Sequence, residues 1–517
     1  MILVDVSAGV IWHKCGEVMT EQPINTLNDV LAVLEMPPLK VNKAITDLTF
    51  DNRRIVGGEL FIAIPGFNTD GRDYIADACK RGAMAVLAEG EGDYPLPVSC
   101  MDAPVIRVDN LQKRVGVLAN RYYRQPSEDV KVIGVTGTNG KTSCCWFISQ
   151  IMEKLGVSCA VMGTVGKGIP GRLSSSLNTT ADVLSTHAFL AELVEQQVSS
   201  LAMEVSSHGL DQGRVDGVFF EVALFTHISR DHLDYHGSLE AYAQAKARLF
   251  SHGQYHHAVI GKDDDFYELM RSACNDQSKV VTWSLEDASA DVYASDIKVL
   301  HQGFKAQVHT PWGQGEMNTS QLGRFSLENL LAVIASLGIQ GFDIQAVLDI
   351  VPTLETVPGR MQRFGGGDQP LVLVDYAHTP DAINSVLTAL REHGAARLGC
   401  IYGCGGDRDR GKRPLMTKAA LSGADFVVLT SDNPRSESPQ MIIDDALMGI
   451  DSTDQKRLTI VVDRAQAIAS TIATAKSGDI LVVAGKGHED YQEVHGKRHY
   501  FDDREQVREA LSNWGQT

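Results

Sequence analysis

The sequence lacks the features of secreted, membrane-spanning and nucleic-acid-binding proteins. It has nine cysteines in 517 residues, an odd number without a Cys-x-x-Cys pair, which disfavours a disulfide framework or a cysteine zinc site. No apolar run reaches the length of a membrane-spanning helix, which is about 20 residues. The first 18 residues contain charged side chains where a signal peptide needs an apolar core. With 47 basic against 65 acidic residues, the net charge of -18 also disfavours binding to a phosphate backbone. We expect a monomer of the cytoplasm that binds neither nucleic acid nor membrane.

Length and patterning predict three domains. A chain of 517 residues with 44% hydrophobic residues exceeds what one hydrophobic core usually holds. Short apolar runs alternate with helix-length segments over residues 130–340 and again from 371 to the end, which is typical of parallel α/β sheets. Prolines and a glycine punctuate residues 351–359, a predicted connector. We therefore expect an α/β protein with a small N-terminal α/β domain (1–109), a central parallel-sheet domain (110–356) and a C-terminal Rossmann-like domain (357–517).

Residues 132–142 have the order of a phosphate loop, with a buried strand, a glycine-rich turn and a helix. Gly137 and Gly140 allow backbone N–H groups to point at phosphate oxygens, Lys141 adds a cation, and the Thr142 hydroxyl is a ligand for Mg²⁺. The usual spacing of the glycines fails, because Val135 stands at the place of the first one. The alternative is an ordinary strand-to-helix turn.

The segment Thr-Gly-Thr-Asn-Gly-Lys-Thr (136–142) resembles the ATP loop of Mur ligases and folylpolyglutamate synthetases, and later segments extend the resemblance over nearly the whole chain. The resemblance implies a central P-loop-type ATPase domain within a three-domain plan. It also implies that a carboxylate is activated as an acyl phosphate, which an amine attacks to release ADP and phosphate. The ATP-binding residues on this analogy are Gly137, Thr138, Asn139, Gly140, Lys141, Thr142 and Ser143.

Polar residues follow two further strands of the central domain. Glu204 ends an apolar strand, and a Ser-Arg-Asp-His-Leu-Asp-Tyr-His segment (229–236) follows the next one. Both positions open onto the ligand crevice of a parallel sheet, where Glu204 and Thr142 suit one Mg²⁺. A solvated loop is the alternative for the histidine segment, whereas the resemblance makes His232 a ligand of a second Mg²⁺.

Lys246 falls on the apolar face of a predicted helix over residues 238–250, together with Leu239, Tyr242 and Leu249. Burial favours the neutral amine, which reacts with CO₂ to give an anionic carbamate. The alternative is a lysine whose ammonium reaches water. In Mur ligases the matching lysine is carbamylated and helps to hold the second Mg²⁺, so the expected catalytic residues are Lys141, Lys246, Glu204 and His232.

The resemblance also assigns a nucleotide-sugar site. Each of its residues taken alone is also compatible with a turn or surface position. The residues expected to bind UDP-MurNAc-dipeptide are Phe50, Asn52, Phe67, Asn68, Thr69, Asn178, Thr179, Thr180, Ser206, Gln212 and Arg214.

Candidate residues of the C-terminal domain each follow the end of an apolar strand, so they converge on one edge of the sheet. Arginine suits the distal carboxylate of diaminopimelate, because its planar fork donates two parallel hydrogen bonds, and Glu489 suits the distal ammonium. In the family the Asp-Asn-Pro-Arg motif (432–435) marks diaminopimelate-adding members, although a tight turn at Pro434 is the alternative. The expected diaminopimelate-binding residues are Arg408, Asp432, Asn433, Pro434, Arg435, Gly485 and Glu489.

Three further residues match positions that contact ATP in the family: Asn329, Arg360 and Asp375. Ser326 and Gly261 depart from asparagines common there. His378 is a candidate base or a satisfied loop histidine. Because the ATP and amine contacts fall on different domains, we predict a hinge at residues 352–359 that closes on ligand.

The expected reaction is ATP- and Mg²⁺-dependent addition of meso-diaminopimelate to UDP-MurNAc-L-Ala-D-Glu, with a CO₂-derived carbamate on Lys246. The alternatives are a lysine-adding or glutamate-adding ligase and a nucleotide-gated switch that hydrolyses ATP without ligating anything.

Overall fold

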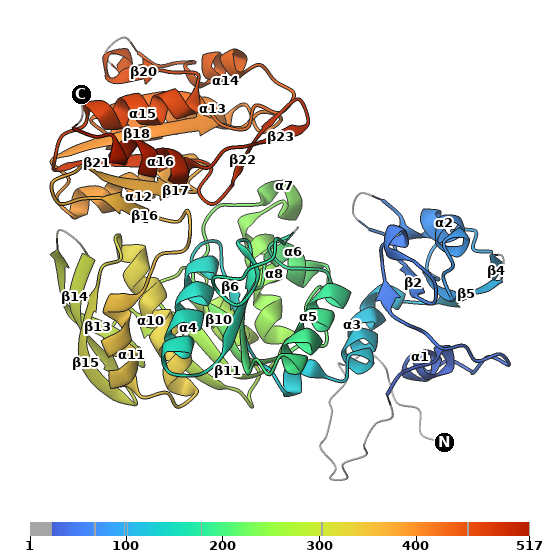
Figure 1. Cartoon of the computed structure of the whole chain (residues 1–517). Helices are drawn as coiled ribbons and strands as arrows, with labels where there is room; N and C mark the ends of the chain where they lie inside the picture. Colours follow the sequence, from blue (N-terminus) through green and yellow to red (C-terminus); the bar gives the residue numbers. More distant parts are fainter. Residues whose placement is uncertain are drawn as a thin grey trace. The chain divides into compact units, whose positions relative to one another are not determined.

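The structure is a computed structural model that describes residues 23–66, 69–97, 99–100, 102–176, 178–300, 303–451 and 454–515. The chain divides into two compact units, residues 1–125 and residues 126–517. The larger unit contains the central and C-terminal sheets (Figure 1).

The N-terminal unit is built on a small sheet with strand order β1-β2-β3-β5-β4, in which only β4 runs antiparallel to its neighbour. Its described strands are β1 (Leu48–Thr49), β2 (Leu60–Ala63), β3 (Ala85–Glu89), β4 (Ser99–Cys100) and β5 (Ala103–Val108). Its helices are α1 (Leu27–Val33), η1 (Asn52–Arg54), η2 (Gly71–Tyr74), α2 (Ile75–Lys80) and α3 (Leu111–Tyr122). Helix α3 contacts α1 and β3, so it packs with the elements before it.

The central sheet has, in the described residues, the order β15-β14-β13-β12-β11-β10-β6-β9-β7-β8. The strands from β13 to β7 in this order are parallel, and β14, β15 and β8 add antiparallel edges. The strands are β6 (Lys131–Thr136), β7 (Cys159–Gly163), β8 (Gly166–Gly168), β9 (Ser200–Glu204), β10 (Phe219–Phe225), β11 (Gln254–Gly261), β12 (Lys279–Ser284), β13 (Val292–Leu300), β14 (Gly303–Thr310) and β15 (Gly313–Thr319).

Helices cover both faces of this sheet (Figure 1), because alternate residues of its strands point to opposite sides. Ile133 and Val135 join the core under α4 and α10, whereas Val132 joins the core under α5 and α8. The described helices are η3 (Pro126–Glu128), α4 (Lys141–Lys154), α5 (Val183–Glu195), α6 (Ser207–Asp211), α7 (Leu233–His236), α8 (Leu239–Ser251), α9 (Tyr267–Ala273), α10 (Arg324–Ile339), α11 (Ile344–Ile350) and η4 (Val351–Thr353).

The C-terminal sheet has the order β16-β17-β21-β18-β19-β20 and is parallel except at β16. Its strands are β16 (Gln362–Gly365), β17 (Leu371–Asp375), β18 (Arg397–Cys404), β19 (Phe426–Ser431), β20 (Leu458–Ile460) and β21 (Asp479–Ala484), and the hairpin β22 (Tyr491–Val494) and β23 (Lys497–Tyr500) follows. The described helices are α12 (Pro380–Glu392), α13 (Lys412–Gly423), α14 (Pro439–Ala446), η5 (Asp454–Arg457), α15 (Arg464–Thr474) and α16 (Asp503–Ser512).

These two sheets bear out the α/β fold that the sequence predicts. The antiparallel hairpins of β13 to β15 extend the central sheet beyond its predicted parallel strands. In both sheets the carboxyl ends of adjacent strands lie level, since Val135 pairs with Glu204 and Asp375 pairs with Ala484. Such an edge is where open α/β sheets bind ligands.

Candidate active site

The predicted phosphate loop connects β6 to α4 and requires its glycines. Gly137 and Gly140 have φ of 146° and 86°, values that side chains rarely adopt. A Cβ on Gly137 would lie 1.9 Å from the Thr226 hydroxyl, and one on Gly140 would lie 2.3 Å from Oδ1 of Asn329. Within the described residues, no side chain caps the N-terminus of α4. The first N–H groups of this helix therefore remain available to an anion, and its dipole favours one.

Two lysine ammonium groups meet at one carbonyl oxygen of this loop. Lys141 donates to the carbonyls of Gly137 at 2.7 Å and Thr138 at 2.8 Å, and Lys246 donates to the same Gly137 carbonyl at 2.8 Å. Burial lowers the pKa of Lys141, and Glu204 opposes this shift. The two positive charges repel each other, so an anion at this position relieves a cost that the protein by itself carries.

Lys246 lies on the buried face of α8, as the helical spacing predicts. Only 1% of the residue is exposed, and its Nζ lies 4.4 Å from the centre of the Tyr242 ring. Burial lowers the pKa of Lys246 well below its usual value, and the charge of Lys141 lowers it further. The lysine does not extend to water, so the solvated alternative is wrong.

Glu204 ends β9 beside the phosphate loop and is 1% exposed. Its carboxylate accepts from the backbone N–H of Thr164 at 2.8 Å and from the Thr164 hydroxyl at 3.2 Å. Thr142 is buried in the first turn of α4. This carboxylate and hydroxyl are hard oxygen donors and fit Mg²⁺.

His232 is the N-cap residue of α7 and has a half-exposed side chain. Its ring lies 4.9 Å from that of His208 and 6.1 Å from that of Tyr242, measured between centroids. Tyr242 also donates to the Thr138 hydroxyl at 3.1 Å, which places this aromatic group beside the phosphate loop. Among the described residues, no group of three or more His, Cys, Asp or Glu side chains forms a ready metal site. A second metal at His232 therefore needs a further ligand.

Four of the residues predicted to bind the nucleotide sugar form one network next to Glu204. The Thr180 hydroxyl donates to the Glu204 carbonyl at 2.9 Å and contacts the Ser206 hydroxyl at 3.0 Å. Arg214 donates to the Thr180 carbonyl at 2.8 Å and to Oε1 of Gln212 at 2.7 Å. The hydroxyl of Thr179 lies 3.2 Å from that of Thr164, and Asn178 accepts at its carbonyl from Ser176.

The remaining predicted nucleotide-sugar residues belong to the N-terminal unit. Phe50 is partly buried, Asn52 donates to Asp77 at 2.6 Å, and the Thr69 carbonyl accepts from Gly66. Phe67 and Asn68 lie outside the described residues.

Asn329 and its neighbours lie behind the phosphate loop. Oδ1 of Asn329 is 3.6 Å from Sγ of Cys144 in α4. Ser326, one of the two departures from the family pattern, is buried and donates to the Leu322 carbonyl at 2.8 Å. At the other departure, a Cβ on Gly261 would lie 2.6 Å from the Trp283 ring, so this tryptophan occupies the space of a side chain.

Asp375, Arg360 and Tyr376 gather at the carboxyl end of β17. Oδ2 of Asp375 accepts from the backbone N–H of Met361 at 2.7 Å, and burial raises the pKa of this carboxyl while Arg360 opposes the shift. The Arg360 guanidinium lies 4.6 Å from the centre of the Tyr376 ring, and its buried Nε has no hydrogen-bond partner among the described residues. The side chain of His378 is exposed and bonds to the Tyr376 carbonyl at 2.8 Å.

The predicted amino-acid residues converge at the ends of β18, β19 and β21. A Cβ on Gly405 would lie 3.1 Å from Nη1 of Arg435 and 3.7 Å from Cγ of Arg408, so the two arginines flank one backbone position. Nδ2 of Asn433 donates to Oε2 of Glu489 at 2.8 Å. A Cβ on Gly485 would meet Oδ2 of Asp432 at 2.6 Å. Pro434 leads into Arg435, whose φ is 51°.

Several residues of these sites carry no sequence signal of their own. Thr226 donates to the Asn139 carbonyl at 2.6 Å and fixes the phosphate loop from β10. Arg413 is 1% exposed and pairs with Glu437 at 2.6 Å, while Glu437 accepts from the N–H of Asp407. Arg413 thereby ties the loop of Arg408 to that of Arg435. Arg413 stands among charged residues at the start of α13, so the sequence does not indicate that it is buried.

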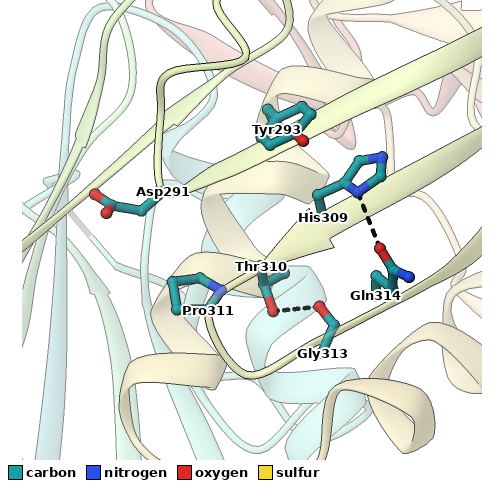
Figure 2. Close-up of a pocket in the computed structure, with 7 residues that line it drawn as sticks. All are labelled: Asp291, Tyr293, His309, Thr310, Pro311, Gly313 and Gln314. Carbon is teal, nitrogen blue, oxygen red and sulfur yellow. Dashed lines mark hydrogen bonds between the residues drawn. The ribbon is translucent and has the colours of Figure 1, made fainter.

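A separate hollow of about 450 Å³ lies on the antiparallel edge strands of the central sheet (Figure 2). The Tyr293 and His309 rings stack there at 4.5 Å. The hollow contains none of the predicted site residues; its lining is Asp291, Tyr293, His309, Thr310, Pro311, Gly313 and Gln314. Within the described part of the chain, no helix is long and apolar enough to cross a membrane.

A phosphate loop at one parallel sheet and convergent charged loops at a second define a nucleotide-binding α/β enzyme. Three family models match the chain: Mur ligase family, catalytic domain, at residues 44–123; Mur ligase middle domain at residues 135–337; and Mur ligase, glutamate ligase domain, at residues 359–487. The chain belongs to the Mur ligase family, whose members use ATP and Mg²⁺.

Two curated relatives are named UDP-N-acetylmuramoyl-L-alanyl-D-glutamate--2,6-diaminopimelate ligase. The one from Pseudomonas aeruginosa is 48% identical over 92% of this chain and 97% of its own length. The one from Pseudomonas syringae pv. tomato is 47% identical over 95% and 98%. A solved structure with the same ligase name is 40% identical, with a TM-score of 0.70 over 93% of this chain and 98% of its own.

Proposed function

We propose that the chain ligates meso-diaminopimelate to the D-glutamate carboxylate of UDP-MurNAc-L-Ala-D-Glu at the expense of ATP, within peptidoglycan synthesis in the cytoplasm. The relatives bear this ligase name over nearly their whole length. One observation supports diaminopimelate as the acceptor. Arg408 and Arg435 lie on either side of Gly405, in the same group of loops as Glu489. Together they offer a fork for a carboxylate and an anion for an ammonium.

The reaction has two balanced steps. A carboxylate oxygen of the D-glutamate attacks the γ-phosphorus of ATP, so that an acyl phosphate forms and ADP leaves. The amine of diaminopimelate then attacks the acyl carbon, the amide bond forms, and phosphate and a proton leave.

The chain contributes mainly position and charge to the first step. Lys141 and the N–H groups at the start of α4 hold the phosphates, and Arg360 screens the charge between carboxylate and nucleotide. Mg²⁺, when bound, neutralises phosphate oxygens. Thr142 and Glu204 would hold one ion. Asn329 and Asp375 complete the ATP site together with Thr138, Asn139 and Ser143.

The buried Lys246 supports a carbamate. Burial lowers its pKa and so favours the neutral amine, whose nitrogen bonds to the carbon of CO₂ with loss of a proton. The resulting carboxylate would supply the further ligand that a second Mg²⁺ at His232 needs. It would also place an anion beside the Lys141 ammonium, since both lysines bond to the Gly137 carbonyl.

The donor substrate would bind through the network around Glu204. Arg214, Gln212, Ser206 and the segment 178–180 are proposed to receive its dipeptide end, with Arg214 neutralising a carboxylate or phosphate. Phe50, Asn52 and residues 67–69 are proposed for the uridine diphosphate end. The acceptor would bind to Arg408, Asp432, Asn433, Pro434, Arg435, Gly485 and Glu489.

The test is ADP release by the purified chain with ATP, Mg²⁺ and UDP-MurNAc-L-Ala-D-Glu, with meso-diaminopimelate or L-lysine as acceptor. Release only with diaminopimelate supports the proposal. Preference for lysine would keep the ligase and contradict the role of Arg435. Equal release without any amine would indicate a nucleotide-gated switch instead.

A further inference from the structure

Lys486 lies between Asn433 and Glu489 of the proposed acceptor site and is not among the residues expected to bind the acceptor. It follows β21 and is completely buried, with 0% of its side chain exposed. Its Nζ donates to Oδ1 of Asn433 at 3.2 Å and to Oε2 of Glu489 at 3.2 Å. The Tyr491 ring lies over it, with its centre 5.4 Å from Nζ.

These bonds fix the orientation of both partners. Oδ1 of Asn433 accepts from Lys486 and from the N–H of Glu493 at 3.0 Å, so its Nδ2 must point to Glu489. Oε2 of Glu489 accepts from both Asn433 and Lys486. Among the described residues no donor reaches Oε1 of Glu489, and this oxygen remains for a ligand.

Lys486 also sets the charge that a ligand meets. A buried ammonium is retained only where an anion or hydrogen bonds compensate it, and here the anion is Glu489. Because Lys486 compensates Glu489, a ligand ammonium at Oε1 of Glu489 gains less attraction than it would from an unpaired carboxylate. A ligand that also brings a carboxylate to Arg408 and Arg435 adds no net charge.

We infer that Lys486 is a positioning residue that determines acceptor specificity: it orients Glu489 and Asn433, and it makes the site prefer a zwitterionic distal end to a bare ammonium. The inference rests on the proposed function, because Glu489 and the arginines must face the acceptor. Removing the charge of Lys486 would leave Glu489 fully negative, which favours a bare cation such as the L-lysine side chain.

The experiment compares the full chain with Lys486→Met, Lys486→Gln and Lys486→Arg, using meso-diaminopimelate and L-lysine as acceptors. For Lys486→Met and Lys486→Gln we expect kcat/KM for diaminopimelate to fall by about tenfold to hundredfold, mainly through KM for the acceptor. The ratio of kcat/KM for lysine to that for diaminopimelate should rise at least tenfold. Lys486→Arg, which keeps the charge, should keep the wild-type ratio.

Three controls separate the outcomes. KM for ATP and for the donor should stay within about twofold, because a general loss of structure would change these as well. Lys497→Met on the exposed β23 should behave as the wild type. If Lys486→Met does not fold, the lysine-to-diaminopimelate ratio of Lys486→Gln alone tests the inference. An unchanged lysine-to-diaminopimelate ratio in the folded neutral variants overturns the inference alone, whereas a wild-type chain that ligates neither acceptor overturns the proposed function and the inference with it.

Discussion

At the scale of single residues, the proposed ATP site contains basic side chains whose burial disfavours their positive charge. Lys141 and Lys246 share the carbonyl of Gly137, and the buried Nε of Arg360 has no partner in the described part of the chain. Such groups are costly in the protein alone and gain partners when anions bind. Their arrangement therefore favours binding of an anion at this position.

Replacing Lys246 by methionine or arginine should abolish ligation. Methionine fills the space without an amine, and arginine keeps a positive charge but forms no stable carbamate, so both variants lose the proposed anionic group. We expect kcat to fall by more than about 100-fold, the range seen when one preorganised electrostatic group is removed. The measurement is ADP release under saturating substrates, with Lys131→Met at the exposed start of β6 as the control. Full activity of Lys246→Met would contradict the carbamate.

A direct observation of the carbamate tests the same residue without activity. Protein equilibrated with ¹³C-labelled bicarbonate should show a carbamate resonance in its NMR spectrum, and Lys246→Arg should lack it.

At the scale of elements, the ends of strands and helices decide the geometry. The level carboxyl ends of β10, β6 and β9 bring Thr226, Gly137 and Glu204 together. In the C-terminal sheet β17, β21, β18 and β19 do the same for the proposed acceptor loops. Helices mainly supply the buried faces that keep these strands in register.

Gly137→Ala should impair ATP binding, whereas Gly156→Ala should not. Both glycines have positive φ, and alanine there costs about 1–2 kcal/mol. The new Cβ of Gly137→Ala would collide with Thr226 and move the phosphate loop, while Gly156, just beyond the C-terminal end of α4, has open space around it. We expect the KM for ATP to rise at least about tenfold only in Gly137→Ala, since 1.4 kcal/mol corresponds to a factor of ten. Equal KM values in both variants would mean that the loop does not hold the phosphates.

Helix α5 should make stability depend on pH. Its fully buried His187 bonds through Nε2 to the Asp216 carbonyl at 2.9 Å, and burial lowers the pKa of His187 from 6.5 to about 4. The unfolded chain therefore binds the proton first, and the free energy of unfolding falls as the pH drops from 6.5 to about 4, by up to about 3 kcal/mol. Urea unfolding at several pH values measures this, and His187→Gln should flatten the dependence. His488, whose pKa burial also lowers to about 4, accounts for a residual slope.

At the scale of the larger unit, contacts of the connector between its two sheets limit where in residues 352–359 the predicted hinge can lie. Leu354 and Val357 still pack in the central core, and Glu355 exchanges two hydrogen bonds of 2.9 Å with Gln150 of α4. Gly359 instead lies against the backbone of Gly487 and His488, where a Cβ would come within 2.1 Å. We therefore place the predicted hinge between Val357 and Gly359.

Ligand binding should change the angle between the central and C-terminal domains through rotation at Pro358 and Gly359. Crystals of the chain with and without a non-hydrolysable ATP analogue and donor substrate should differ in this angle, since Lys141 and Arg360 would both contact the nucleotide from different sides. His393, at the C-terminal end of α12, bonds to Leu300 and Gly323 of the central domain, and we expect these bonds to change on closure. Identical angles in the two crystals would contradict the hinge.

The sequence alone determined the features that depend on local order. Periodic apolar runs predicted the parallel strands of the C-terminal sheet and β6, β9, β10 and β11 of the central sheet. The Gly-Lys-Thr segment predicted the phosphate loop, and helical spacing predicted that Lys246 lies on the apolar face of its helix. These patterns are local because each records the backbone geometry and burial of one element. The resemblance to Mur ligases added the family.

Only the tertiary structure decided which distant groups meet. That Lys246 and Lys141 bond to one carbonyl, that Arg413 joins two loops, and that Lys486 pairs with Glu489 follow from strand order and register, which no single segment encodes. Burial of a polar side chain also depends on neighbours far along the chain. For this reason Thr226 and Lys486 carry no signal in the sequence, although each fixes part of a proposed site.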